Sequence, residues 1–434
     1  MRILTWAVPR TAVARRSTGL IASRPSTQPL EVSLLLNLGP YKTLFSDREL
    51  KRIVLASILP RLPAGINGLS LTLMLQSLYG SFAIGGTVSA AYLIALGVAS
   101  PLLGRFVDQR GPRVVMLPFG IAHAIAIVLL VIAALQRVSP SLLMVFALLA
   151  GMSFPPVSMT VRAMWRKSKL PDATKQLGFA LEGVIMETIF VCGPLIVSFF
   201  LFFEAPAVAL MFSACATLLG IVLFARSGAL ERWGEVELGE RHWLGPLKLL
   251  GVRRALVVSM LLGASFGLQE IGMMAAAKTA GSQAAVGWLF AAYSVPSAIA
   301  GLMYGTRQFS WPLNRQMALG HVWIAVLSLL LTQVSSLWVF ALGCAVCGMA
   351  VGPAITASQM QLGKLTTAEY TTEAFTWSMT LFMVALGAAF ACGGWLVDTY
   401  GVGAPMSCAA CTAGLGALMC LRVPETFAQA AAAS

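Results

Sequence analysis

Four ionisable side chains interrupt stretches that are otherwise apolar, and these side chains are the best placed to do chemistry. Glu182 and Glu187 lie within LGFALEGVIMETIFVCGPLIV (177–197), and Glu270 and Arg61 lie within two other apolar runs. Burial raises the pKa of a carboxyl group, whereas a neighbouring cation lowers it. A carboxyl group that alternates between these two environments takes up a proton in one and releases it in the other.

The composition indicates what kind of segment carries these groups. Of the 434 residues, 58% are hydrophobic and 11% are charged, and the mean hydropathy is +0.82. A soluble domain averages about 45–50% apolar and about 25% charged residues. The chain is therefore expected to be an integral membrane protein. An ionised carboxylate near the bilayer midplane costs about 2.5–3.5 kcal/mol, so each buried acid needs a partner or a function.

Twelve apolar runs are long enough to span a bilayer, which takes about 20 residues as a helix. They do not show the alternation of barrel strands, so the expected fold class is an all-α membrane protein. The runs are 53–78, 83–106, 113–135, 141–165, 177–201, 205–226, 254–278, 283–306, 316–334, 337–361, 371–396 and 403–421. They divide the chain into an extension (1–45), a six-helix bundle (46–226), a linker (227–253), a second six-helix bundle (254–423) and a tail (424–434).

Basic residues are concentrated on one side of these spans. Of 30 Lys and Arg residues, only Arg137 and Lys278 fall on the side opposite the termini, and Arg61 lies within the first span. This bias predicts that both termini are cytoplasmic. The net charge of +13 is thus a topology signal with anionic lipid as its counter-charge, and no nucleic-acid partner is expected. Residues 1–45 lack the apolar core of a secretory signal and are interpreted as a disordered extension or the product of a misplaced start codon.

The two halves contain matching short segments. GMSFPP at 151–156 returns as GMAVGP at 348–353, and AAY at 90–92 returns at 291–293. His123 and His321 stand in corresponding third spans. These matches predict a duplicated six-helix unit, an arrangement that suits a transporter whose site lies between two moving halves.

The loop after the second span, LLGRFVDQRGPRVVM (102–116), resembles the first signature of the major facilitator superfamily. That signature has a Gly, an acid four residues later, and basic residues around a second Gly. The resemblance covers about 45–423 and is to bacterial members that look like drug or metabolite exporters without an assigned substrate. It implies a bacterial inner-membrane location and a cytoplasmic latch, in which Asp108 pairs with Arg113 or Arg162. The latch residues would be Gly104, Asp108, Arg110, Gly111, Arg113 and Arg162.

The chain also departs from the superfamily's drug–proton antiporters. The Arg expected early in the fourth span is missing, because Arg137 comes too early and Arg162 too late. The antiporter signature of the fifth span is reduced to Gly193-Pro194. Proton exchange is therefore implied by the resemblance to the superfamily, whereas these two motifs do not themselves indicate it.

The same resemblance implies that spans one, five and seven line a central cavity. Glu187 is then the first candidate for proton coupling or substrate contact, and Glu270 is the second. Glu182 lies about 140° around the helix from Glu187 and could pair with Arg61 or Arg162. Structural ion pairs or packing hydrogen bonds are the alternative for all of these acids. Further candidates are Gln269, Glu373 and Trp377, and the candidate hinge residues are Pro155, Pro156, Pro194 and Pro353.

The sequence contains no residue pattern that indicates metal binding, redox chemistry, ATP use or enzymatic catalysis. Cys344–Cys347 and Cys408–Cys411 have the spacing of metal or redox pairs, but they lie in apolar spans without His or charged neighbours at ligand spacing. No metal and no cofactor is therefore expected. The chain has no phosphate-binding loop for ATP and no nucleophile–base constellation in a polar segment, so it is not expected to be an enzyme.

Three functions fit these observations. The first is proton-coupled efflux of a small amphipathic molecule by alternating access. The second is uptake of an organic anion, with Arg61 binding its carboxylate and Glu187 carrying the proton. The third is a membrane sensor or scaffold that does not transport. A monomer suffices for alternating access and is the expected state.

Overall fold

A computed structural model describes residues 48–167, 171–227, 245–305, 307, 309–367 and 370–426. This part of the chain is helical and contains no strand. The predicted extension (1–45), most of the linker (227–253) and most of the tail (424–434) lie outside it.

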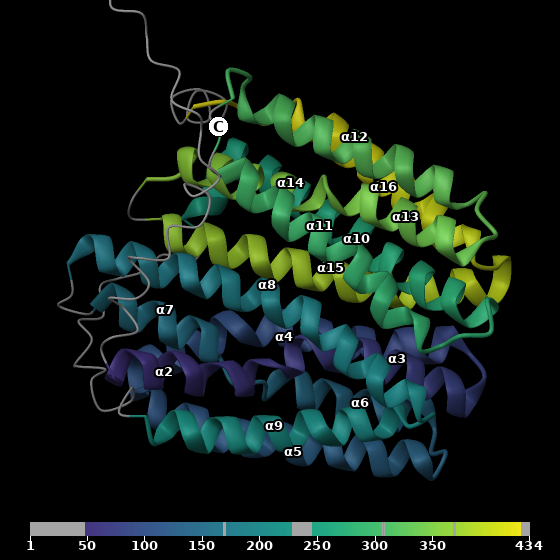
Figure 1. Ribbon diagram of the computed structural model, residues 1–434. Helices are drawn as coiled ribbons and strands as arrows, with labels where there is room; N and C mark the ends of the chain where they lie inside the picture. The colour runs from purple at the N-terminus through teal and green to yellow at the C-terminus, as the bar shows by residue number, and fades with distance from the viewer. Residues whose placement is uncertain are drawn as a thin grey trace, which may run out of the picture.

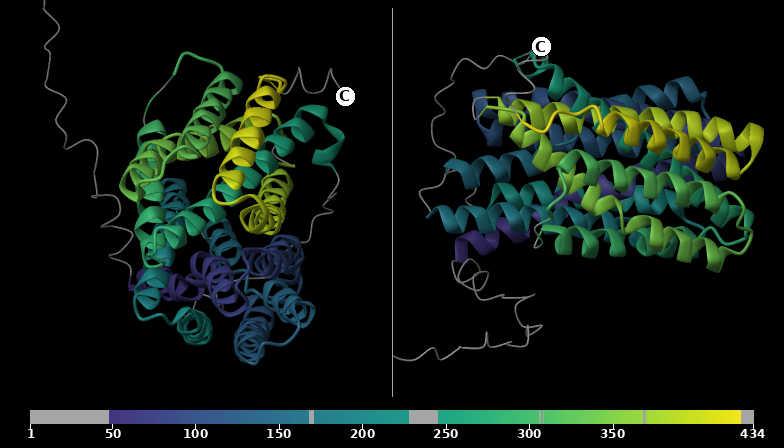
Figure 2. Two further views of the ribbon diagram at one scale, coloured as in Figure 1. Left: turned by 90° about the vertical axis from the view of Figure 1, so that its right-hand side faces the viewer. Right: turned by 90° about the horizontal axis from the view of Figure 1, so that it is seen from above.

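The helices form two groups, which are stacked one above the other in Figure 1 and in the left view of Figure 2. The lower group consists of α2 (Arg48–Ile58), η2 (Leu59–Arg61), α3 (Pro63–Tyr79), α4 (Phe82–Arg110), α5 (Pro112–Leu135), α6 (Pro140–Met152), α7 (Val157–Lys167), α8 (Asp172–Phe202) and α9 (Pro206–Ala225). The upper group consists of η3 (Pro246–Lys248), α10 (Leu250–Thr279), α11 (Ala285–Gly305), α12 (Leu313–Leu331), α13 (Leu337–Gly348), α14 (Val351–Lys364), α15 (Thr371–Tyr400) and α16 (Gly403–Cys420). We call them the first and the second group.

Eleven helical segments of the described chain are long and apolar enough to cross a membrane. They support a multi-pass membrane protein. The ninth predicted span, 316–334, overlaps α12, which does not reach the same apolarity. The reason lies in its first turn, where Asn314, Arg315 and Gln316 precede the apolar residues.

Prolines explain why two of the spans are not continuous helices. The first span changes from α2 to α3 through the short helix η2, which contains Pro60, and α3 then begins at Pro63. In the fourth span, α6 ends at Met152 and α7 begins only after Pro155 and Pro156. Proline cannot donate the helical hydrogen bond, and it disfavours helical geometry in the residue before it.

The other two candidate hinge prolines do not interrupt a helix. Helix α8 continues through Pro194. Pro353 lies in the first turn of α14, where the missing N–H costs no helical bond. The tenth span is instead divided before Pro353, between α13 and α14. A hinge function for any of the four prolines stays a prediction.

The two groups touch each other along only a few helices. The extensive contacts between them are made by α4 with α15 and by α8 with α11, whereas the other large contacts lie within a group. Glycine makes the α4–α15 contact close, because a Cβ at Gly86 would meet the Phe390 carbonyl and one at Gly394 would meet the Phe82 carbonyl. Small residues let membrane helices approach in this way.

One contact occurs in the same form in both groups. A Cβ at Gly151 would meet the carbonyl oxygen of Tyr92, and a Cβ at Gly348 would meet that of Tyr293. These glycines and tyrosines belong to the short segments that recur in the sequence. A duplicated unit would produce such matched contacts, and the duplication itself stays a prediction.

Candidate functional site

Arg61 and Glu182 form an ion pair inside the first group. Arg61 ends η2, Glu182 lies on α8, and the distance from Nη1 to Oε2 is 2.9 Å. The side chains are only 2% and 1% exposed. Burying a single charge is costly, and close pairing offsets much of that cost. The Arg61 charge is therefore already compensated by the protein itself.

Helix α7 completes the surroundings of this ion pair. The Trp165 indole lies near the Glu182 carboxylate, and Arg162 adds positive potential at both members of the pair. The Trp165 ring also packs where a Cβ of Gly178 on α8 would lie. The pair thus connects η2, α7 and α8. Of the two partners predicted for Glu182, Arg61 is the one in contact.

Glu187 lies on a different face of α8. Its side chain is exposed and forms no hydrogen bond or ion pair with the described part of the chain. Pro194 and Ser198, seven and eleven residues later, lie within about 20° of the same helix face. Ser198 donates to the Ala284 carbonyl (2.8 Å) and accepts from the Gly287 N–H (2.5 Å). Because these partners border α11, Glu187 is directed toward the second group.

Glu270 lies on α10 and is half-buried. One turn earlier, the Phe266 ring lies 5.7 Å from Tyr293 of α11 and 6.3 Å from Phe382 of α15, measured between ring centroids. Glu270 is also close enough to influence Tyr293 electrostatically. Helices α11 and α15 are the two that meet the first group. Within the described residues, no hydrogen bond or ion pair engages the Glu270 carboxylate.

The remaining polar candidates are held within the second group. Gln269 is 3% exposed, donates to Ser265 Oγ (3.2 Å) and accepts from the Cys347 thiol (3.7 Å). Glu373 lies in the first turn of α15 and is half-buried. Trp377, one turn later, packs against the apolar cluster around Leu256, Ala374 and Val423.

The predicted latch lies where α4 ends and α5 begins. A Cβ at Gly104 would meet Met159 Sδ of α7 at 3.1 Å, which is close enough to require an adjustment. Gly111 ends α4 with φ of 82°, a conformation that side chains other than glycine rarely adopt. Local packing at Gly104 and the backbone conformation at Gly111 therefore explain why these two positions are glycine.

The charged residues of the predicted latch are less tightly arranged. The Arg110 guanidinium lies 5.6 Å from the Phe106 ring, and Arg113 and Arg162 are exposed. The side chain of Asp108 lies outside the described part of the structure. A latch through Asp108 accordingly stays a prediction.

Asp398, near the end of α15, is an acid that the sequence-based site did not include. Its carboxylate accepts from Ser81 Oγ (2.6 Å), the Phe82 N–H (3.0 Å) and the Ala83 N–H (2.9 Å). These donors form the start of α4, so an acid of the second group caps a helix of the first. Ser81 can be recognised in the sequence as an N-cap residue, but nothing in the sequence around it indicates that Asp398, 317 residues away, is its partner.

Further contacts lie at the same end of the molecule. Gln283 donates to Gln76 across the two groups (3.4 Å), and the Lys278 ammonium lies 5.4 Å from the Phe82 ring. Like the hydrogen bonds of Ser198 and Asp398, the Gln283–Gln76 hydrogen bond connects the two groups. All of them lie at the end remote from Arg48 and Arg422.

No group of three or more His, Cys, Asp or Glu side chains suited to a metal ion occurs in the described residues. Carboxyl groups without a partner, such as those of Glu187 and Glu270, are groups that can take up a proton or attract a cation. The Arg61–Glu182 ion pair connects η2 with α8 within the first group.

No family model and no curated protein matches this sequence. Solved structures do match. The human organic anion transporter MFSD10 (TETRAN) has a TM-score of 0.58 and 19% identity over 85% of this chain and 99% of that one. A mutant of the nucleoside transporter NupG has a TM-score of 0.67 and 15% identity over 86% and 99%. An auto-inhibited POT family peptide transporter has a TM-score of 0.68 and 12% identity over 87% and 96%. At these identities the similarity establishes a shared fold, so this chain has the helical fold of these membrane transporters.

Proposed function

We propose that this protein is a secondary active transporter that exports a small cationic or neutral amphipathic molecule in exchange for protons. One observation carries the proposal. Among the described residues, Ser198, Gln283 and Asp398 make hydrogen bonds between the two groups at one end. Glu187 and Glu270, which have no hydrogen-bond or ion-pair partner among the described residues, lie on sides that face the junction. The fold shared with solved transporters supports the same proposal.

The contacts at one end suit alternating access. If both termini are cytoplasmic, as the basic residues predict, Asp398 and Ser198 close the outer end in this conformation. Opening that end requires α4 to leave α15 and α8 to leave α11. The Asp398 hydrogen bonds are charge-assisted, and each such bond contributes about 1.5–3 kcal/mol. They would therefore bias the protein toward the conformation closed to the outside.

The free acids suit exchange of a cation for protons. A carboxylate at Glu187 or Glu270 attracts a cationic substrate when ionised and releases it when protonated. Each charge that crosses the membrane gains or loses about 2.3 kcal/mol per 100 mV. Exchange of one proton for one monovalent cation moves no net charge, so the pH gradient alone drives it. Exchange of two protons per cation, one at each acid, would also draw on the membrane potential.

Uptake of an organic anion is less well supported. That mechanism needs a free cation, and Arg61 is held by Glu182 at 2.9 Å and is 2% exposed. An anionic substrate would have to displace the Glu182 carboxylate. The solved structures with this fold include transporters named for organic anions, nucleosides and peptides, so the fold does not select a substrate class.

The test is transport by purified protein in liposomes with an imposed pH gradient. The probes are a fluorescent lipophilic cation and a fluorescent organic anion. We expect proton-driven movement of the cation by the wild type and at least a tenfold loss in Glu187→Gln, with a smaller loss in Glu270→Gln. The matched control is Glu204→Gln, because Glu204 is exposed beyond the end of α8. Movement of the anion alone, or full activity in both site variants, would refute the proposal.

A further inference from the structure

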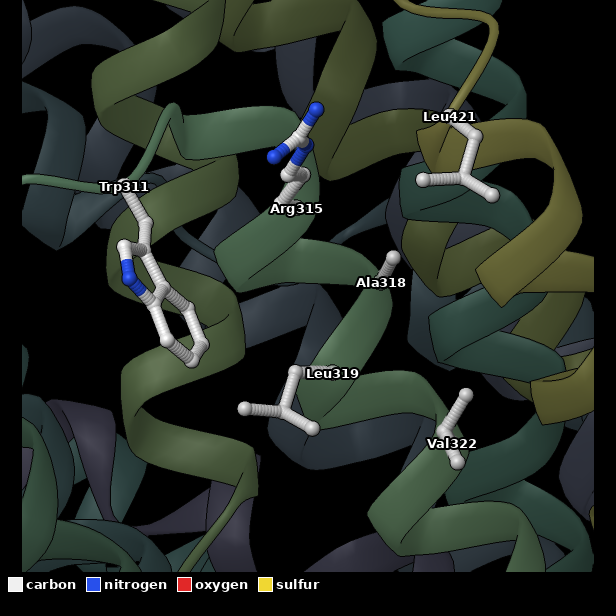
Figure 3. Close-up of a pocket in the computed structure, with 6 residues that line it drawn as sticks. All are labelled: Trp311, Arg315, Ala318, Leu319, Val322 and Leu421. Atoms are coloured by element: carbon white, nitrogen blue, oxygen red, sulfur yellow. The ribbon is translucent and has the colours of Figure 1, made fainter.

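A groove runs along the outer face of the second group, away from the first group. It has a volume of about 420 Å³ and lies between α12 and the end of α16 (Figure 3). Its lining residues are Trp311, Arg315, Ala318, Leu319, Val322 and Leu421. Helix α12 makes its extensive contacts with α13, α14 and α16, so this groove is separate from the junction that carries Glu187 and Glu270.

The walls of the groove are apolar and accessible. Leu319 is 54% exposed, Val322 is 46% exposed and Leu421 is 57% exposed. In a chain that crosses a membrane, such a surface is covered by acyl chains because water is absent at that depth. The groove therefore offers a recess in which an acyl chain gains contacts that a smooth helix surface would not provide.

One end of the groove is polar and cationic. Arg315 is exposed, and its guanidinium makes no hydrogen bond or ion pair with the described residues. Arg422 follows Leu421, and its exposed guanidinium is likewise without such a partner, while its carbonyl accepts from Arg254 Nη1 (2.9 Å). None of the six lining residues is acidic.

An aromatic residue marks the same end. Trp311 is 61% exposed and stands one turn before Arg315 (Figure 3). Tryptophan is enriched where the hydrocarbon meets the headgroups. The groove thus passes from an apolar floor at Val322 to an aromatic and cationic rim at Trp311 and Arg315, which is the polarity profile of a phospholipid.

We propose that this groove binds one anionic phospholipid. Its phosphate contacts the Arg315 guanidinium, whose planar fork matches phosphate oxygens in a bidentate manner. One acyl chain lies along Leu319 and Val322. The net negative charge of the headgroup is required, because a zwitterionic lipid brings its own cation to a rim that already contains arginines.

The test is native mass spectrometry of the full chain, purified with equal amounts of phosphatidylglycerol and phosphatidylcholine. We expect the wild type to retain one phosphatidylglycerol in preference to phosphatidylcholine. In Arg315→Gln the preference falls about fivefold, because a basic residue near the membrane contributes about 1 kcal/mol to anionic lipid binding. The control is Arg253→Gln, since Arg253 is exposed at the start of α10 and outside the groove.

A second variant separates the groove from general charge attraction. Val322→Trp fills the apolar floor without changing any charge, and we expect it to lose the retained lipid as Arg315→Gln does. Both variants should elute as the wild type does in size-exclusion chromatography. Equal retention of both lipids by the wild type, an equal loss in Arg253→Gln, or full retention in Val322→Trp would overturn the proposal.

Discussion

The two helix groups have similar residues at corresponding positions, but the hydrogen bonds of these residues differ. In the first group, Asn67 Nδ2 donates to the Tyr92 hydroxyl (3.0 Å) and lies 3.4 Å from His123 Nε2, while Asn67 Oδ1 accepts from Ser213 (2.5 Å). His123 Nδ1 lies 2.8 Å from the Ala150 carbonyl oxygen. Because Nδ1 must donate to that carbonyl, Nε2 is free to accept from Asn67. The network is complete with a neutral histidine.

The corresponding polar groups of the second group make fewer hydrogen bonds. His321 Nδ1 lies 2.9 Å from the Met317 carbonyl oxygen, but its buried Nε2 has no hydrogen-bond partner. Tyr293 takes the place that Tyr92 has in the first group, with Glu270 nearby. No cation is paired with Glu270 in the described residues.

This difference suggests that the two groups have different roles. In the first group, Arg61 is paired with Glu182, and the Asn67, Tyr92 and His123 side chains are joined by hydrogen bonds. This group is suited to act as a stable support. In the second group, the Glu270 carboxyl group has no cation paired with it among the described residues, and the proposed mechanism uses a change in its charge. Glu187 in the first group likewise has no such partner among the described residues.

The largest expected effect comes from breaking the ion pair in the first group. Arg61→Met leaves the Glu182 charge buried without its partner, and loss of one member of a buried pair costs about 3–5 kcal/mol. The double variant Arg61→Met/Glu182→Leu removes both charges and should recover most of this loss. The measurement is the free energy of unfolding in mixed micelles. An equal loss in the single and double variants would show that packing of Arg61, and not its charge, stabilises the group.

A smaller effect is expected at the matched glycines. Gly151→Ala and Gly348→Ala each place a Cβ against a tyrosine carbonyl, and overpacking of this kind costs about 1–3 kcal/mol. Because the two contacts correspond, the two losses in stability should be alike. Gly183→Ala is the control, since nothing lies within 4 Å of its Cβ position. A loss confined to one of the two glycines would weaken the case for a duplicated unit.

The smallest effect is expected for the difference in stability between the two histidine variants. His123→Leu leaves the buried Asn67 and Ala150 groups without a partner, which costs about 1–3 kcal/mol. His321→Leu removes a side chain whose Nε2 is already unsatisfied, so it should cost less than His123→Leu. Thermal unfolding of both variants in the same detergent measures the difference. The reverse order would contradict the distinction between the two groups.

Much of the architecture could be predicted from composition and spacing. Apolar runs of bilayer length are local properties, so the helical membrane fold followed from them, as did the break at Pro155 and Pro156. The prediction was less accurate for α12, where polar residues such as Arg315 belong to the helix that carries the apolar run. The separation of Glu182 and Glu187 onto different helix faces was also predictable, because five residues always subtend about 140° on a helix.

What the amino-acid order alone determined is therefore the kind of segment, its approximate ends and the short list of ionisable residues inside the apolar runs. Only the tertiary structure decided which of them meet. It paired Glu182 with Arg61, left Glu187 and Glu270 without partners, and brought Asp398 to the start of α4. The physical reason is distance along the chain. Helix formation depends on neighbours a few residues away, whereas these contacts depend on how helices more than a hundred residues apart pack against each other.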